Sequence, residues 1–379
     1  MKKKVAVLGA TGSVGKNALD VLREGKDFFE PVLFTCHTNR EDLLKLGREF
    51  PSAMLALSAE PDGAARTAEI SHYGRSGLLR AILSCGADIA VNGIAGGAGL
   101  EPSMTVLESG ANLALANKET IVMAGSLVFE KAHSKNVTVL PVDSEHSAIF
   151  NLCEAHGREN IDEVLLTASG GPFRDHTGEQ LKNVTREEAL THPVWKMGQK
   201  ITVDCATLAN KGLEVIESAI LFDLDPSQIT VVIHPQSIIH SMVRLKDGVV
   251  YAQLSRPDMR LPIHDTLYWP ELQSCPFGRL SFDNLSLSFE KPDYKKFPLL
   301  ALACQAAKQD GLYPAVYNAA NEAAVEAFLS NRVVFLEISR IVEYVLQKDW
   351  SGAAKDIQTV LEADSRAKDA ANSYVAALR

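Results

Sequence analysis

Residues 3–25 read KKVAVLGATGSVGKNALDVLREG: a short apolar run, a glycine-rich turn and an amphipathic stretch. Gly9, Gly12 and Gly15 are spaced G-x-x-G-x-x-G, a variant of the dinucleotide-binding fingerprint. Such a turn lets the backbone approach a pyrophosphate, and the following helix presents free N–H groups and the positive end of its dipole. The stretch therefore predicts the first strand, turn and helix of a nucleotide-binding domain. The alternative is a tight turn that binds nothing.

Further strand-like runs alternate with helix-like spacers after this stretch. They are PVLFTC (31–36), AMLALS (53–58), ADIAVNGI (87–94), NLALAN (112–117) and VTVLPV (137–142). This alternation predicts an α/β fold with a doubly wound, Rossmann-like parallel sheet at the N-terminus. A central α+β domain with a lid loop and a C-terminal helical bundle are expected to follow. The expected boundaries are 1–143, 144–268 with a lid at about 170–199, a linker at 269–296, and 297–379.

Length and composition agree with a multidomain globular protein. The chain has 379 residues, 46% hydrophobic and 22% charged, so two or three domains are expected. A net charge of −9 with scattered basic residues argues against a nucleic-acid partner. The start MKKKVAVLGA contains no signal-peptide core, and no apolar run is long enough for a membrane span. The six cysteines are widely spaced, which favours reduced thiols and a cytoplasmic location.

The second strand-like run ends FTCHTNR (34–40), where an NAD-binding protein usually carries an acidic residue. His37, Thr38, Asn39 and Arg40 stand there instead, and these side chains can accept a 2′-phosphate. The sequence therefore favours NADPH over NADH.

Two acidic residues follow the strand-like run 137–142, in PVDSEHSAIF (141–150). If the extended backbone continues to Glu145, Asp143 and Glu145 point the same way, and their repulsion calls for solvent, a basic partner or a bound cation. The alternative is an ordinary turn in which Asp143 or Ser144 caps a helix. Lys118 lies at the carboxyl end of another predicted strand, where ligands bind in such sheets; a solvated loop lysine is the alternative.

The middle of the chain holds a second group of polar residues. TASGGPF (167–173) reads as a strand and a glycine hinge, and HPVWKMG (192–198) as a lid that excludes water or as a surface loop. In ITVDCATLANKGLEVIESAILF (201–222) a strand end followed by a helix is expected. Lys211 and Glu214 share one helix face, as a surface ion pair or as part of a metal and phosphate site. Alanine-rich stretches near the end predict helices.

Nine strings occur in the order typical of one enzyme family. They are LGATGSVG, LANKE, PVDSEHSA, TASGGPF, HPVWKMG, VDCATLANKGLEVIE, HPQSIIHSMV, PDMRLPI and NAANEAAVEAFL. With these strings the chain resembles the 1-deoxy-D-xylulose 5-phosphate reductoisomerases nearly end to end. The resemblance implies a homodimeric, NADPH-dependent enzyme of isoprenoid precursor synthesis that takes a small phosphorylated sugar. Such an enzyme uses Mg²⁺ or Mn²⁺, with Co²⁺ as a further candidate, to rearrange its substrate and reduces the product to 2-C-methyl-D-erythritol 4-phosphate.

The resemblance also implies roles for individual residues. The metal ligands would be Asp143, Glu145 and Glu214, which with Lys118 form the catalytic set. The substrate would contact Lys118, Ser144, Glu145, Ser169, His192, Trp195, Met197, Cys205, Asn210, Lys211 and Glu214. The cofactor would contact Thr11, Gly12, Ser13, Val14, Asn39, Arg40, Asn117, Glu119 and Gly198.

Two departures from the family pattern stand out. The family usually has serine at Cys205, and a thiol is a weaker hydrogen-bond donor for a phosphate. It also usually has glycine and a basic residue at His37 and Thr38, a loss for which Arg40 can compensate.

Two other classes of protein are alternatives: an NADP-dependent semialdehyde dehydrogenase, which needs a nucleophilic cysteine such as Cys153 or Cys205, and a non-catalytic NADP-binding sensor. Turnover without metal would favour the first, and binding without turnover the second.

Overall fold

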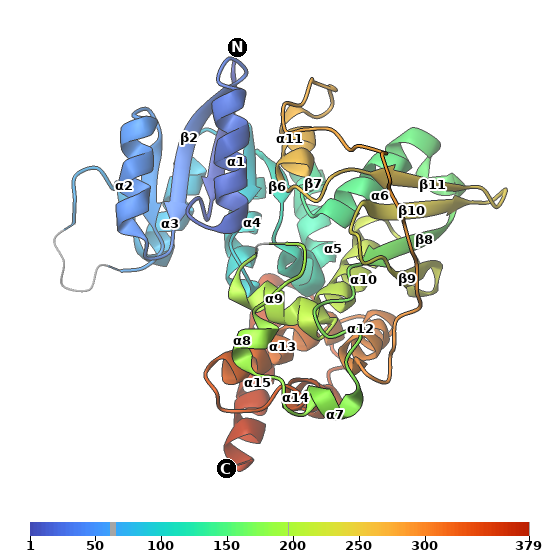
Figure 1. Ribbon diagram of the computed structural model, residues 1–379. Helices are drawn as coiled ribbons and strands as arrows, with labels where there is room; N and C mark the ends of the chain where they lie inside the picture. The colour runs from blue at the N-terminus through green and yellow to red at the C-terminus, as the bar shows by residue number, and fades with distance from the viewer. Residues whose placement is uncertain (61–65, 196, 379) are drawn as a thin grey trace. The chain divides into compact units, whose positions relative to one another are not determined.

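The computed structural model describes residues 1–60, 66–195 and 197–378 (Figure 1). It divides into two compact units. Unit 1 comprises Met1–Thr120, Val128–Ser147 and Asp258–Gly278, and unit 2 comprises Ile121–Leu127, Ala148–Pro257 and Arg279–Arg379. The domain boundaries expected from the sequence stay a prediction. Within the described ranges, no helix combines the length and the apolar character that a membrane span requires.

Unit 1 is built on a parallel sheet of seven strands in the order β4-β3-β2-β1-β5-β6-β7. The chain adds strands outward on one side of β1 and then on the other, so the sheet is doubly wound as predicted. The strands are β1 (Lys3–Leu8), β2 (Phe29–Cys36), β3 (Met54–Leu57), β4 (His72–Tyr73), β5 (Ile89–Asn92), β6 (Asn112–Leu115) and β7 (Val139–Pro141).

Helices connect these strands. They are α1 (Ser13–Glu24), α2 (Arg40–Glu49), α3 (Gly74–Ser84), η1 (Gly97–Gly99), α4 (Leu100–Glu108) and α5 (Lys118–Lys135); α6 (Ser144–His156) follows β7, and α11 (Arg260–Tyr268) packs against α1. Figure 1 colours the first of them blue and cyan. Helical crossovers cover both faces of a parallel sheet, which explains why β1 and β5 are buried along most of their length.

The glycine fingerprint is needed for close backbone packing. Gly9 has φ +77°, a conformation that side chains disfavour, and the Gly12 N–H donates to the Gly9 carbonyl at 3.0 Å. A Cβ on Gly15 would stand 2.4 Å from the same carbonyl oxygen. The turn is therefore tight enough for α1 to begin directly beside the end of β1.

Unit 2 contains a four-stranded sheet in the order β11-β10-β8-β9. Its strands are β8 (Ile161–Ala168), β9 (Ile229–Ile233), β10 (Ile239–Leu245) and β11 (Val250–Leu254). β8 pairs parallel with β9 and antiparallel with β10. The buried Thr167 hydroxyl lies 2.8 and 2.7 Å from the carbonyl oxygens of Ile239 and His240, which fixes β8 at the irregular start of β10.

The remaining elements of unit 2 are helical. They are η2 (Arg158–Asn160), α7 (Gly178–Leu181), α8 (Arg186–Ala189), α9 (Gln199–Ala206), α10 (Ala209–Leu221), η3 (Pro226–Gln228), α12 (Pro298–Gln309), α13 (Tyr313–Leu329), α14 (Glu337–Leu346) and α15 (Ile357–Ala377). α13 packs against α12, α14 and α15, drawn orange to red in Figure 1, which confirms the predicted C-terminal helices.

One element differs from the prediction: the strand expected in ITVDCA is the helix α9. Each of its β-branched residues makes the free energy of helix formation less favourable by only a fraction of 1 kcal/mol. α9 packs against α10 and α13 and buries Val203 and Asp204, so tertiary contacts decide the local structure.

Candidate active site

The paired acids follow β7 in a strand-to-helix turn. β7 ends at Pro141 and α6 begins at Ser144, so the expected extended backbone through Glu145 is wrong. Asp143 takes the helix-capping position: its carbonyl accepts from the Ser147 N–H at 2.8 Å, and its Oδ1 accepts from the Glu145 N–H at 3.3 Å. The capping alternative is therefore the correct description of the local backbone.

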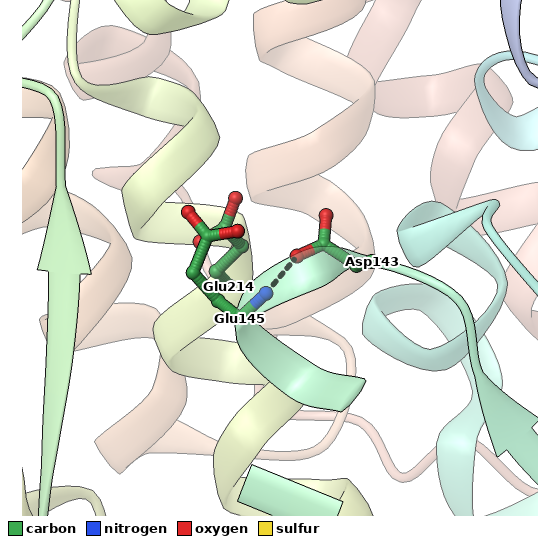
Figure 2. A group of neighbouring side chains, drawn as sticks. All are labelled: Asp143, Glu145 and Glu214. Carbon is green, nitrogen blue, oxygen red and sulfur yellow. Dashed lines mark hydrogen bonds between the residues drawn. The ribbon is translucent and has the colours of Figure 1, made fainter. Parts of the chain in front are cut away.

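The two acids of this turn lie close to a third carboxylate, that of Glu214 on α10. One carboxylate oxygen from each of Asp143, Glu145 and Glu214 lies within 4.8 Å of the other two, and Figure 2 shows the three side chains converging. Opposite ligands of a Mg²⁺ ion are about 4.2 Å apart, twice the ~2.1 Å bond length. Three carboxylates at this spacing are the oxygen donors that Mg²⁺ and Mn²⁺ prefer, so the donor set fits such an ion.

Asp143 is held in its charged form. Lys118 Nζ donates to Asp143 Oδ2 at 2.7 Å, and the side chains are 5% and 15% exposed. His146 Nδ1 lies 3.5 Å from Asp143 Oδ1. Burial alone raises the pKa of Asp143, but Lys118 and His146 outweigh burial and hold this pKa well below its usual range. A permanently ionised carboxylate suits a cation ligand. Lys118 therefore lies in the site and is not a solvated loop lysine.

α10 carries the second part of the cluster on one face, as its spacing predicts. Asn210 Nδ2 donates to Glu214 Oε1 at 2.6 Å, and Lys211 forms an ion pair with Glu214. Lys211 and Glu214 are 3% and 1% exposed, so the surface ion pair considered from the sequence is wrong. Burying an amide, an ammonium and a carboxylate together costs free energy unless they satisfy one another, which this face arranges.

The glycine hinge after β8 packs onto α9. Gly171 has φ +69°, and a Cβ there would stand 2.5 Å from the Cys205 carbonyl oxygen. The hinge therefore brings Ser169 close to the C-terminal turn of α9, where Cys205 lies half-buried. A glycine at position 171 is therefore what allows the hinge to pack this closely against α9.

His192 in the predicted lid contacts the same hinge. Its Nδ1 accepts from the backbone N–H groups of Val194 and Trp195 at 3.2 and 2.9 Å, so the proton of the neutral ring is on Nε2. Nε2 lies 3.2 Å from Ser169 Oγ and can donate to it, which leaves the serine hydroxyl hydrogen to donate elsewhere. Burial lowers the pKa of His192 to about 4, so the ring is neutral at pH 7.

The rest of the lid sequence lies beside this contact. The Trp195 ring centroid is 6.5 Å from that of His240, so the side chain packs on unit 2. Met197 is part-exposed, and Gly198 precedes α9 with its carbonyl accepting from Thr202. Lys196, within the predicted lid, lies outside the described residues.

Asn117 and Glu119 begin α5 and are buried in a local hydrogen-bond network. Asn117 Oδ1 accepts from the Thr120 N–H at 3.0 Å, and its Nδ2 lies 2.9 Å from Glu119 Oε2. The same amide donates to the carbonyls of Ile94 and Gly96 at 2.7 and 2.9 Å. The network holds the carboxyl ends of β5 and β6 together beside the fingerprint turn with Thr11, Gly12, Ser13 and Val14.

The structure also adds residues that the sequence prediction missed. Asp204 is 1% exposed, forms an ion pair with Lys200 at 2.9 Å and accepts from Asn321 Nδ2 at 2.8 Å. This network anchors α9, and hence Cys205, to α13. His146 could have been found because it lies three residues after Asp143 on α6. Asn321 gave no such signal, because its partner is 117 residues away.

The chain is similar to known proteins over nearly its whole length. Three family models match: 1-deoxy-D-xylulose 5-phosphate reductoisomerase at residues 5–125, its C-terminal domain at 139–222, and DXP reductoisomerase C-terminal domain at 254–370. A curated 1-deoxy-D-xylulose 5-phosphate reductoisomerase from Treponema denticola is 44% identical over 97% of this chain and 96% of its own length. One from Desulfitobacterium hafniense is 45% identical over 97% of both.

Solved structures agree with this assignment. The reductoisomerase from Zymomonas mobilis in complex with NADPH is 38% identical, covers 99% of both chains and has a TM-score of 0.90. A DOX-P reductoisomerase in complex with NADPH, fosmidomycin and magnesium is 36% identical over 99% of both chains, with a TM-score of 0.92. These matches do not favour the semialdehyde dehydrogenase alternative. In addition, burial raises the pKa of the Cys153 thiol, one of its two candidate nucleophiles, to about 11. This chain, with its glycine-rich turn and convergent carboxylates, belongs to the 1-deoxy-D-xylulose 5-phosphate reductoisomerase family.

Proposed function

We propose that this protein converts 1-deoxy-D-xylulose 5-phosphate to 2-C-methyl-D-erythritol 4-phosphate, using NADPH and Mg²⁺ or Mn²⁺. The observation that carries the proposal is the convergence of Asp143, Glu145 and Glu214, two of them paired with buried lysines, in a chain of this family. A sensor that only bound NADP would not need this buried charge, which is costly to maintain.

Asp143, Glu145 and Glu214 would hold the divalent ion, which would be Mg²⁺, Mn²⁺ or Co²⁺ bound through the same carboxylate oxygens. The ion would polarise the carbonyl and hydroxyl oxygens of the substrate and so stabilise the negative charge that develops during rearrangement. Lys118 Nζ, fixed by Asp143, would donate to a substrate hydroxyl and keep its proton positioned there. Ser144, at the first turn of α6, would contact a second hydroxyl.

The phosphate of the substrate would bind on the hinge, α9 and α10. Ser169 would donate its free hydroxyl hydrogen, and Lys211 would supply the positive charge, with Asn210 and Cys205 as further donors. His192, Trp195 and Met197 would cover the substrate and exclude water. Because the phosphate is remote from the reacting carbons, its binding energy can serve to orient them.

The cofactor would lie along unit 1. The backbone of Thr11, Gly12, Ser13 and Val14 would bind the pyrophosphate, and Asn39 and Arg40 would lie near the adenosine. Asn117, Glu119 and Gly198 would contact the nicotinamide half, which would supply the hydride for the reduction. The Asn39 amide is engaged with Asp42, with contacts of 3.2 and 2.9 Å, so its contribution would be mainly to hold α2 in place.

The assay that tests this function follows the nicotinamide absorbance of NADPH with 1-deoxy-D-xylulose 5-phosphate and Mg²⁺ or Mn²⁺. Oxidation should stop with chelator and in Glu145→Gln, and should persist in Glu159→Gln, a matched change at an exposed carboxylate in η2. Turnover that survives the chelator would contradict the metal-dependent reaction. NADPH binding without turnover would favour the sensor.

A homodimer is also proposed. β11 is an edge strand of its sheet, and Val249, Val250 and Tyr251 are 46%, 39% and 40% exposed there. An exposed apolar edge favours pairing with a second copy. Sedimentation should give twice the chain mass, and Val250→Lys should shift it toward the monomer. The predicted cytoplasmic location would be tested by cell fractionation.

A further inference from the structure

We infer that Asp204 and Asn321 are positioning residues for the substrate phosphate: their contact holds α9 on α13 and so sets the affinity of the phosphate subsite. That subsite comprises Ser169, Cys205, Asn210 and Lys211, and the inference rests on the function proposed for them. It gives a helix of the C-terminal bundle a part in substrate binding.

The contact joins two side chains that are both buried. Asp204 lies in the last turn of α9 and is 1% exposed, and Asn321 lies on α13 and is fully buried. Asn321 Nδ2 donates to Asp204 Oδ1 at 2.8 Å, and Lys200 Nζ lies 2.9 Å from Asp204 Oδ2. A buried carboxylate is costly unless its oxygens have donors. The pair therefore favours one position of α9 on α13, which α9 contacts directly (Figure 1).

α10 packs against the same face of α13. A Cβ on Gly212 of α10 would stand 2.9 Å from the Tyr317 hydroxyl oxygen. That hydroxyl donates to the Leu299 carbonyl at 3.1 Å, which fixes the ring. Burial, and after it the charge of Asp204, raises the pKa of Tyr317 well above its ordinary value, so the hydroxyl keeps its proton. Tyr317 and Asn321 are four residues apart, so one face of α13 supports both helices of the subsite.

The position of α9 affects the hinge as well. Cys205 directly follows Asp204, and its carbonyl oxygen would be 2.5 Å from a Cβ on Gly171. A shift of α9 on α13 would therefore move Cys205 and, through the hinge, Ser169, while Lys211 stays on α10. Donors that bind one phosphate together must each be placed to within about 0.5 Å. The subsite is thus sensitive to a contact that does not touch the substrate.

The pair combines one carboxylate with one amide, and this arrangement can be exchanged. Asn321→Asp alone would place a second carboxylate against Asp204, and the repulsion of two buried like charges should push α9 away from α13. Adding Asp204→Asn restores one carboxylate and one amide, with donor and acceptor exchanged between the two helices.

Steady-state kinetics of the full-length protein with Mg²⁺ and NADPH would test the inference. Asn321→Asp should raise the KM for 1-deoxy-D-xylulose 5-phosphate by at least about tenfold, with a smaller change in kcat. The inhibition constant of inorganic phosphate should rise by a similar factor. The dissociation constant of NADPH should change little, because most of its proposed contacts lie in unit 1. The exchanged double variant should recover most of the lost affinity.

A pair of matched variants separates positioning from general stability. Asn318 is also fully buried on α13, but among the described residues its side chain bonds only to Glu322, at 3.1 Å in the same helix. Asn318→Leu and Asn321→Leu should both lower the melting temperature, and only Asn321→Leu should raise KM.

Two results would overturn the inference: an unchanged KM in both Asn321 variants, or an equal rise of KM in Asn318→Leu. If the wild-type protein does not turn over the sugar phosphate, the proposed function fails. Calorimetry with inorganic phosphate on the same variants would then decide the positioning role separately: weaker binding in the Asn321 variants alone would support it, and equal binding in all would refute it.

Discussion

Lys118 and Asp143 form an ion pair inside the protein: Lys118 Nζ lies 2.7 Å from Asp143 Oδ2, with side chains only 5% and 15% exposed. A lysine in this position has two consequences that can be measured apart. It stabilises the fold by neutralising a buried carboxylate, and it offers a fixed proton donor at the proposed metal site.

Lys118→Met should separate these consequences. The variant leaves the Asp143 charge buried without its partner, so the free energy of unfolding should fall by about 3 kcal/mol. Activity should fall more than about 100-fold, because a positioned proton donor is lost. Adding Asp143→Asn should restore much of the stability and none of the activity. Lys131→Met, which removes a more exposed ion pair with Glu108, should change neither by much. Near-normal turnover in Lys118→Met would argue against a catalytic role.

His192 should make the protein sensitive to mild acid. Its pKa is lowered by burial from 6.5 to about 4 in the folded protein, so between these values the unfolded chain binds more protons. Stability should therefore decrease as the pH falls from 6.5 toward 4, by about 1 kcal/mol once partial solvent exposure is taken into account. A proton on Nδ1 would also remove the acceptor for the N–H groups of Val194 and Trp195, so both hydrogen bonds would be lost.

Denaturant unfolding at several pH values would measure this effect. His192→Gln should flatten the difference in unfolding free energy between pH 4 and 6.5. Parallel curves for the wild type and the variant would show that the acid sensitivity comes from other groups.

Much of unit 1 could be predicted because its signals are local. The fingerprint glycines, the apolar strands and the helical spacers each lie within a few residues, and parallel βαβ topology follows from their alternation. The doubly wound sheet was accordingly expected from residues 3–142 alone.

The misassigned segments depend instead on distant partners. α9 is a helix because it packs on α10 and α13, and the α10 ion pair is buried because other helices cover it. At Gly212, for example, a Cβ would stand 2.6 Å from Ala303 on α12. Local patterns give the type of residue at each site position but not its burial, which decides whether Lys211 and Glu214 are solvated or functional.

The hinge gives a prediction with a close control. Gly171→Ala would place a Cβ 2.5 Å from the Cys205 carbonyl at a φ of +69°, so it should cost about 1–3 kcal/mol of stability and raise the KM for the sugar phosphate by displacing Ser169. Gly178→Ala, in the first turn of α7 with open space around it, should leave KM unchanged. Thermal denaturation and steady-state kinetics would compare the two. Equal behaviour would mean that the hinge adapts to a side chain.

Cys205 gives the last prediction, since it stands where the family usually has serine. If its side chain donates to the substrate phosphate, Cys205→Ser supplies a stronger donor of similar size, and KM should fall about threefold to tenfold with little change in kcat. Cys205→Ala removes the donor and should raise KM. Cys153→Ser, a matched change on α6, should have no effect on KM. An unchanged KM in both Cys205 variants would mean that Ser169, Lys211 and their neighbours bind the phosphate without help from this position.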